Sequence, residues 1–138
     1  MSTYLLDTHY LLWALVDTKK LSEKIKDIIV DPDNTIIVSS ISFWEISLKY
    51  SLGKLEINGF TPEQLPQACT EVGFLIEPLS PLDSSSYHQL YPSHHKDPFD
   101  KMLIWQAINN KYTFISNDVL IANYQTFGLR LLSGQKIK

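Results

Sequence analysis

Short apolar runs alternate along this chain with longer segments of helical periodicity. Residues 3–6 (TYLL) and 35–39 (TIIVS) have the apolar and β-branched composition that is typical of buried strands. Weaker runs of the same kind occupy residues 74–79, 113–116 and 129–132. Because helical segments separate consecutive strands, the pattern predicts a central parallel sheet that is covered by helices on both faces.

The segments between the predicted strands begin with recognisable helix signals. Ser42 and Glu45 form the S-x-x-E pattern of a capping box, and Thr61 begins a second one. Asp97 followed by Pro98 is typical of an N-cap and a first helical turn. We therefore expect helices over residues 8–16, 22–30, 42–52, 61–73, 81–90, 98–110 and 118–124.

Length and composition fit one globular domain. The 138 residues are 44% hydrophobic and 20% charged, and no linker or repeat divides them. The sequence thus predicts a single α/β domain, with three α/β/α layers, over residues 1–138, of which 133–138 form a frayed tail.

No apolar run is long enough to cross a bilayer and the start lacks the features of a signal peptide, so we expect a cytoplasmic protein. Cys69 is the only cysteine, which excludes an internal disulfide and a thiolate metal cluster.

The net charge narrows the class of nucleic-acid partner. It is −3, with 15 acidic against 12 basic residues. Duplex-DNA-binding domains are usually strongly basic, so this balance argues against one. An enzyme acting on nucleic acid remains possible, because acids gathered at a metal site can account for the negative balance.

Four acidic residues follow predicted strands or open the helices after them. Asp7 directly follows the first strand, and Glu45 lies in the first helical turn after the second. Asp100 opens the 98–110 helix, and Asp118 comes two residues after the fourth strand. Each could be an ordinary helix-start residue. Together they would meet at the carboxyl edge of a parallel sheet, where ligands bind in such folds.

Carboxylates crowded at one edge repel each other and raise each other's pKa unless a cation binds. With oxygen ligands and no cysteine cluster, the expected cation is Mg²⁺, with Mn²⁺ as a plausible substitute. Such a site suits hydrolysis of a phosphodiester bond by metal-activated water. Neither a nucleophile elbow nor a P-loop glycine pattern is present, which disfavours acyl transfer and nucleotide-triphosphate binding.

Four segments give the chain a resemblance to a known family. They are YLLDTHYLLWAL, VSSISFWEISLKYSLGKL, HHKDPFDKMLIWQA and FISNDVLIANY. Taken together they resemble the PIN-domain nucleases, and within them the VapC-like toxins of type II toxin–antitoxin pairs. The segments stand in the family's order and span nearly the whole chain.

The resemblance assigns roles to individual residues. Asp7, Glu45, Asp100 and Asp118 match the family's four acids, so it implies that they are the catalytic and metal-binding residues. Ser116 matches the hydroxyl residue two places before the last acid. Asp97 is a neighbouring acid that we expect to cap its helix first.

Further residues are candidates for substrate contacts. Thr8 borders the same edge, as does Asn117, which stands where the family often has a basic residue. Lys49 either pairs with Glu45 four residues earlier or approaches the RNA backbone. We expect His95 and Lys96 to touch substrate phosphates from an exposed loop. The predicted substrate-binding set is Thr8, Lys49, His95, Lys96, Ser116 and Asn117.

The resemblance also implies an activity and partners. The protein would be a Mg²⁺-dependent endoribonuclease that cleaves single-stranded regions of RNA, is inhibited by a cognate antitoxin and forms a homodimer. The predicted helix 42–52 is apolar on two faces, and we expect its Trp44 and Leu48 face to hold the antitoxin or the second subunit.

Two other classes of function remain open. A PIN-like domain could bind RNA or protein without cleaving, although the complete set of acids argues against this. A phospho-accepting signalling domain would need adjacent acids after the first strand and a lysine after the last. Here Thr8 and His9 follow Asp7, which disfavours that class.

Overall fold

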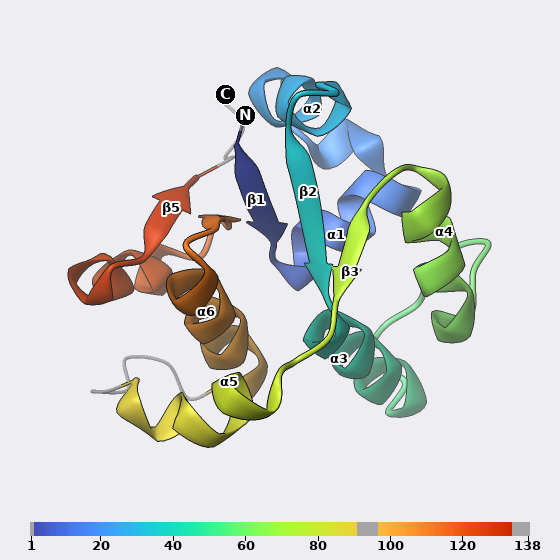
Figure 1. The fold of residues 1–138 in the computed structure, drawn as a ribbon. Helices are drawn as coiled ribbons and strands as arrows, with labels where there is room; N and C mark the ends of the chain where they lie inside the picture. Colours follow the sequence, from blue (N-terminus) through green and yellow to red (C-terminus); the bar gives the residue numbers. More distant parts are fainter. Residues whose placement is uncertain (1, 91–96, 134–138) are drawn as a thin grey trace.

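A parallel sheet forms the centre of the computed structural model, which describes residues 2–90 and 97–133 (Figure 1). Across these described ranges the sheet has five strands in the order β3-β2-β1-β4-β5, and every adjacent pair is parallel. The strands are β1 (Thr3–Leu6), β2 (Thr35–Ser39), β3 (Leu75–Glu77), β4 (Thr113–Ile115) and β5 (Arg130–Leu132). The parallel sheet predicted from the sequence is confirmed.

Helices connect the strands in the predicted places. The α-helices are α1 (Thr8–Val16), α2 (Glu23–Val30), α3 (Ser40–Ser51), α4 (Leu65–Glu71), α5 (Pro81–Ser86) and α6 (Pro98–Asn110). The 3-10 helices are η1 (Thr18–Lys20), η2 (Pro62–Gln64), η3 (Tyr87–Gln89) and η4 (Val119–Phe127). Over residues 2–90 and 97–133, no helix is both long and apolar enough to span a membrane.

Three predicted helices differ in detail from the observed ones. The segment 61–73 divides into η2 and α4, because Pro66 near the start of α4 has no N–H to continue a single helix. The segment 81–90 likewise divides into α5 and η3, and 118–124 is the 3-10 helix η4. The capping box at Thr61 is confirmed, with the Thr61 N–H donating to Gln64 Oε1 at 2.8 Å.

Neighbouring strand residues point to opposite faces of the sheet, and both faces are buried. Leu6, Val38 and Ile115 pack into the core formed with α1, α2 and α4. Their neighbours, such as Leu5 and Phe114, pack into the core formed with α6 and η4. The molecule therefore has the three α/β/α layers expected from the sequence.

The order of the strands creates a switch point beside β1. The chain builds outward from β1 through β2 to β3, and then returns to place β4 on the other side of β1. Ligands of open α/β sheets bind in the crevice at such a point, at the carboxyl ends of the strands. The N–H of Asp7 donates to the carbonyl of Ile115 at 3.1 Å, so the ends of β1 and β4 are held side by side.

The start of α3 corrects one prediction. The helix begins at Ser40, and its N-cap is Ser39, the last residue of β2, whose Oγ accepts from the Ile41 N–H at 3.1 Å. The capping box of Ser42 and Glu45 predicted from the sequence is therefore wrong. Because β2 runs into α3 without a loop, both residues lie inside the helix, where they are buried.

Ser39 also joins α3 to α6. Its hydroxyl donates to Gln106 Oε1 at 2.5 Å, and both side chains are fully buried. Replacing Ser39 would thus remove an N-cap and leave a buried acceptor without this donor.

We predict that Ser39→Ala lowers the free energy of unfolding by about 2 kcal/mol, the sum of a lost cap and a lost buried hydrogen bond. Urea unfolding followed by circular dichroism measures the change. Ser51→Ala is the matched control, because the Ser51 hydroxyl donates to the Leu48 carbonyl on the exposed end of the same helix and has no other partner among the described residues. The control should stay within about 0.5 kcal/mol of wild type. Equal losses in the two variants would contradict the assignment of the cap.

Candidate functional site

A cavity of about 330 Å³ lies at the switch point between β1 and β4. Three of the four predicted acids line it: Asp7 after β1, Asp100 in the first turn of α6, and Asp118 at the start of η4. The other lining residues are His9, Tyr10, Trp13, Asn117 and Ile121. Residues that are far apart in the sequence thus contribute carboxylates to one hollow.

The Asp7 carboxylate both caps helix α1 and is buried. Its Oδ1 accepts from the Tyr10 N–H at 2.8 Å, so it caps α1, and its side chain is only 7% exposed. Burial raises the pKa of Asp7 above its ordinary value, and the charge of Glu45 adds to the rise. The Tyr10 N–H, the Ser116 hydroxyl and His9 offset part of the increase in this pKa. The fold therefore places a carboxyl group where its charge is costly unless a cation compensates it.

Glu45 is held from both sides by hydrogen-bond donors. It is 2% exposed, and its Oε1 accepts from the Thr8 hydroxyl at 2.6 Å. Its Oε2 forms an ion pair with Lys49, one turn later in α3. The Thr8 hydroxyl also lies 3.0 Å from the buried Ser42 hydroxyl. The predicted pairing of Glu45 with Lys49 is confirmed, and Thr8 joins α1 to the same network.

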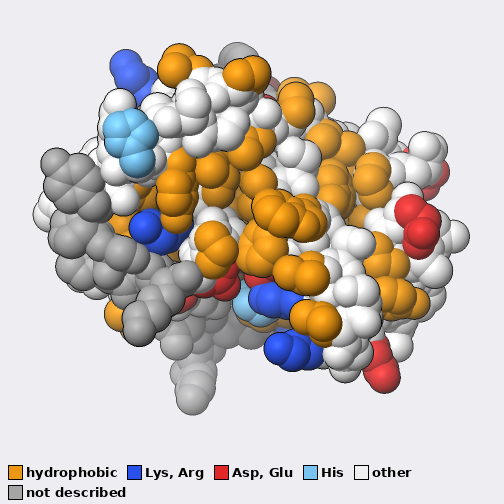
Figure 2. Space-filling view, turned by 90° about the horizontal axis from the view of Figure 1, so that it is seen from below, with side chains coloured by type: hydrophobic (Ala, Val, Ile, Leu, Met, Phe, Trp, Pro, Cys, Tyr) orange, Lys and Arg blue, Asp and Glu red, His pale blue; other side chains and the backbone are white. Residues whose placement is uncertain are grey.

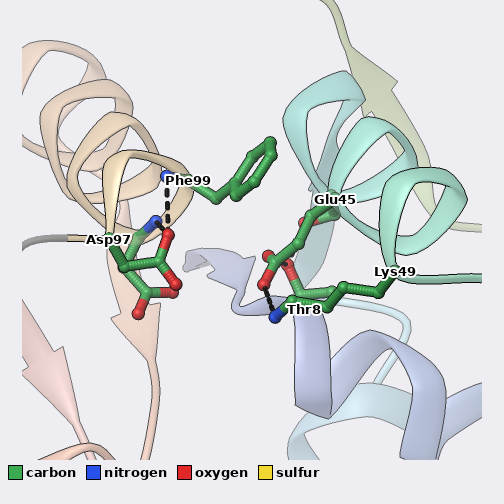
Figure 3. Close-up of polar contacts among 7 residues, drawn as sticks. Thr8, Glu45, Lys49, Asp97 and Phe99 are labelled. Atoms are coloured by element: carbon green, nitrogen blue, oxygen red, sulfur yellow. Dashed lines mark hydrogen bonds and ion pairs between the residues drawn. The ribbon is translucent and has the colours of Figure 1, made fainter. Parts of the chain in front are cut away.

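Glu45 faces the acids at the start of α6 (Figure 3). Carboxylate oxygens of Glu45, Asp97 and Asp100 all lie within 4.8 Å of one another, close enough to share a cation. Asp97 is the N-cap predicted from the sequence, because its Oδ1 accepts from the Phe99 N–H at 2.8 Å. Asp100 belongs both to this cluster and to the cavity lining, so it connects the two.

The ammonium group of Lys49 interacts electrostatically with all three acids of this cluster. Partial burial lowers its pKa, but the hydrogen bond and charge of Glu45, together with the charges of Asp97 and Asp100, outweigh burial and raise the pKa above its ordinary value. The ammonium group therefore stays protonated at neutral pH and remains a positive charge beside the cluster.

The residues after β4 complete the edge. Ser116 is 1% exposed, and its hydroxyl accepts from the Asp118 N–H at 3.2 Å. Asp118 is exposed and caps η4 through the Leu120 N–H at 2.9 Å. Asn117 is half-buried in the cavity wall, and its Oδ1 accepts from the Ser133 hydroxyl at 3.4 Å. Of the other predicted substrate residues, His95 and Lys96 lie outside the described residues.

Sequence reasoning missed several side chains at the site. His9, Tyr10 and Trp13 line the cavity from the first turns of α1, and the rings of Tyr10 and Trp13 meet edge-on with their centroids 5.0 Å apart. The position of His9 two residues after Asp7, in the first turn after the strand, was the available signal. The proximity of Trp13 to the acids depends on how α1 packs.

A larger cavity of about 540 Å³ lies between α5 and α6 and also has carboxylates in its wall. Those carboxylates already serve the fold: Glu77 Oε1 accepts from the Tyr112 hydroxyl at 2.7 Å, and Asp83 Oδ1 accepts from the Asn109 amide at 2.8 Å. It contains none of the four predicted acids. The cavity at the switch point is therefore the better candidate for catalysis.

The donor groups of the switch-point cavity fit a hard divalent cation. Three carboxylates line it, and Glu45 and Asp97 bring two more next to Asp100. Oxygen-rich sites of this kind suit Mg²⁺ or Mn²⁺. Cys69 is buried in the core on the α4 side of the sheet, away from the cavity lining.

Comparisons with known proteins agree with this reading of the fold. The sequence profile of the PIN domain matches residues 4–125, a range that contains Asp7, Glu45, Asp100 and Asp118. No curated protein sequence matches the chain.

Solved structures of similar shape cover nearly the whole chain. VapBC2 from Rickettsia felis, bound to a DNA fragment from its promoter, is 20% identical with a TM-score of 0.62, over 95% of this chain and 98% of that one. FitAB bound to the IR36 DNA fragment is 17% identical with a TM-score of 0.67, over 98% and 97% of the two chains. A domain of a functionally unknown protein from Methanocaldococcus jannaschii is 16% identical with a TM-score of 0.63, over 100% and 94%. At these identities the likeness establishes a shared fold.

We predict that Asp7→Asn raises the free energy of unfolding of the metal-free protein at neutral pH. Asparagine keeps the cap on the Tyr10 N–H but buries no charge. Because the pKa of Asp7 is raised in the folded state, the cost of its charge is present in full above that pKa and vanishes below the ordinary value of 3.8. Each unit of the rise in pKa corresponds to about 1.4 kcal/mol.

Urea unfolding in EDTA, from about pH 8 to about pH 4, measures this difference. The advantage of Asp7→Asn should shrink as the pH falls. Asp27→Asn on the exposed face of α2 is the matched control and should show no such trend. A variant that is less stable than wild type at neutral pH would contradict the role given to the buried charge.

Proposed function

The chain belongs to the PIN-domain family, and we propose that it is a Mg²⁺-dependent endoribonuclease that hydrolyses RNA phosphodiester bonds. The observation that carries the proposal is the cavity at the switch point, where Asp7, Asp100 and Asp118 from three separate elements meet. Families of this type are generally nucleases, and an acidic cavity whose described lining contains no serine, threonine, cysteine or lysine suits hydrolysis by water.

Asp7, Asp100 and Asp118 would hold Mg²⁺, or Mn²⁺ in its place, with Glu45 completing the acidic set. A divalent ion bound there supplies Lewis acidity that activates water and stabilises charge on the phosphate. The chain's own residues fix the geometry: the Tyr10 N–H orients Asp7, and the Thr8 hydroxyl orients Glu45. Thr8 and Ser116 are 6% and 1% exposed, so we propose that they serve the reaction by holding the acids.

A route for the RNA backbone leads away from the cavity. Trp13 and Asn117 line both the cavity and a neighbouring pocket that carries Lys19 and Lys20. The Lys20 ammonium lies 5.9 Å from the centroid of the Trp13 ring. A lysine pair next to an aromatic ring suits a single-stranded polyanion, whose phosphates pair with ammonium groups and whose bases can stack. We propose Lys49 and Asn117 as further contacts, and His95 and Lys96 remain predictions from the sequence.

We further propose that the protein is the toxin of a toxin–antitoxin pair, is inhibited by a cognate antitoxin and forms a homodimer. The similarity of its fold to the VapBC and FitAB structures supports this role. So does an apolar surface on α3 and its C-cap Leu52, where Trp44 is 62%, Leu48 40% and Leu52 58% exposed. Figure 2 shows hydrophobic side chains spread over the face at the carboxyl end of the sheet, close to lysine and acidic groups. An apolar surface of this kind is typical of a protein interface.

The principal prediction concerns catalysis. Asp7→Asn should reduce Mg²⁺-dependent cleavage of single-stranded RNA by at least about 100-fold, because it removes a charge that the ion needs. Gel analysis of a labelled RNA measures cleavage, and EDTA should abolish it in wild type. Asp27→Asn, which makes the same chemical change on α2, should cleave at the wild-type rate. Folded wild-type protein that binds RNA but cleaves none with Mg²⁺ or Mn²⁺ would show a binding module instead.

A separate prediction concerns partners. Trp44→Ala and Leu48→Ala should weaken dimerisation or binding of the antitoxin, because each removes apolar area from the exposed face of α3. Light scattering after size exclusion measures the dimer, and copurification with a coexpressed candidate antitoxin measures binding of the antitoxin. Val30→Ala, at a 75% exposed residue of α2, is the control. Variants that dimerise and bind the antitoxin as wild type does would show that α3 is not the contact surface.

A further inference from the structure

Ser42 is a buried hydroxyl residue close to the acidic site. It lies in α3 three residues before Glu45, and its side chain is fully buried. Its Oγ lies 3.0 Å from the hydroxyl oxygen of Thr8 in α1. Because α3 begins at Ser40 with Ser39 as its N-cap, Ser42 does not cap the helix. Its hydroxyl group therefore serves a contact inside the fold.

The number of hydroxyl protons decides the direction of the hydrogen bonds around Thr8. Thr8 has one hydroxyl proton and two oxygen atoms within reach, Oε1 of Glu45 at 2.6 Å and Oγ of Ser42 at 3.0 Å. Glu45 is nearer, and its carboxylate, which is paired with the Lys49 ammonium group, can only accept. Thr8 therefore donates to Glu45, and Ser42 supplies the proton of the bond between the two hydroxyl groups.

We propose that Ser42 is a positioning residue of the acidic site, and that it acts on Glu45 through Thr8. The three side chains form a relay, in which Ser42 donates to Thr8 and Thr8 donates to Glu45. The inference rests on the proposed function, in which Glu45 completes the acidic set that holds the divalent ion.

The relay strengthens and directs the bond that Glu45 accepts. A hydroxyl group that accepts a hydrogen bond becomes a stronger donor, so Ser42 strengthens the bond from Thr8 to Glu45. The bond from Ser42 also holds the Thr8 hydroxyl in the orientation that points its proton at the carboxylate. Figure 3 shows Thr8 meeting Glu45 between α1 and α3. Because the relay begins and ends on α3 and passes through α1, it joins the two helices beside the site.

The relay also influences the spacing of two acids. Thr8 directly follows Asp7, which the Tyr10 N–H fixes to the start of α1 at 2.8 Å. Burial, and with it the charge of Glu45, raises the pKa of Asp7, so the two carboxylates interact across the gap between the helices. A shift of α1 against α3 would change their separation, and the relay opposes that shift.

A serine that only stabilised the fold would behave differently in a double-mutant cycle. The cycle compares wild type, Ser42→Ala, Thr8→Val and the double variant, and isothermal titration calorimetry gives the affinity of each for Mn²⁺. Ser40→Ala is the matched control, because the Ser40 hydroxyl accepts from the Leu79 N–H at 3.2 Å and belongs to the same helix but not to the relay. Urea unfolding checks that every variant is folded.

We expect Thr8→Val to bind Mn²⁺ at least about tenfold more weakly than wild type, because it removes a partner of the Glu45 carboxylate. Ser42→Ala should bind it about threefold more weakly, because it weakens the bond from Thr8 without removing it. In the Thr8→Val background, Ser42→Ala should have no further effect, because the route to Glu45 is already broken. The control Ser40→Ala should bind Mn²⁺ as wild type does.

The outcomes separate the inference from the proposed function. Equal affinity of wild type and Ser42→Ala, or independent losses that add up in the double variant, would overturn the inference and leave the proposed function standing. No binding of Mn²⁺ by wild type would overturn the proposed function, and the inference with it.

A measurement in EDTA tests the relay without metal. The ¹³C chemical shift of the Glu45 carboxyl carbon reports the hydrogen bonds that this group accepts. Thr8→Val and Ser42→Ala should move it in the same direction, Ser42→Ala by less, and Ser40→Ala should leave it in place. If Ser42→Ala does not fold, Ser42→Cys replaces it, because a thiol donates only weakly. An unmoved Glu45 resonance in the folded Ser42 variant would overturn the relay.

Discussion

Like charges held together in a partly buried edge of the sheet are the constraint on which this structure depends. Asp7 is buried at the end of β1, where burial raises its pKa, and Glu45 is buried in α3 close enough to add to that rise. The fold keeps them in place through backbone bonds that are needed in any case, such as the cap of α1 and the contact of Asp7 with β4. The acids are thus part of the framework of the domain.

The two faces of helix α3 have different roles. Its inner face carries Ser42 and Glu45, which meet Thr8 of α1, and its outer face carries Trp44 and Leu48. The Trp44 ring packs edge-on against Phe99, with the centroids 5.0 Å apart, and Phe99 precedes Asp100 in α6. The exposed surface and the acidic site are therefore connected by direct packing, so a molecule bound to α3 would contact the helix pair that positions the acids.

The acidic site divides into two environments at the same edge of the sheet. One holds Glu45 between a hydroxyl group and an ammonium group of the chain itself. The other is a cavity of about 330 Å³ whose described lining offers carboxylates without a basic side chain of lysine or arginine type. Asp100 stands between them.

The sequence by itself determined the class of fold and the edge at which the acids gather, because both depend on local patterns. Apolar runs and caps gave the order of strands and helices, and a parallel sheet brings Asp7, Asp118 and the start of α6 to one edge. Only the tertiary structure decided that Ser39 caps α3, that Thr8 of α1 donates to Glu45, and that Glu45 meets Asp97 and Asp100 in a cluster. The cap depends on β2 running into α3 without a loop, and the other two contacts depend on how α3 packs against α1 and α6. Local periodicity carries no information about such packing.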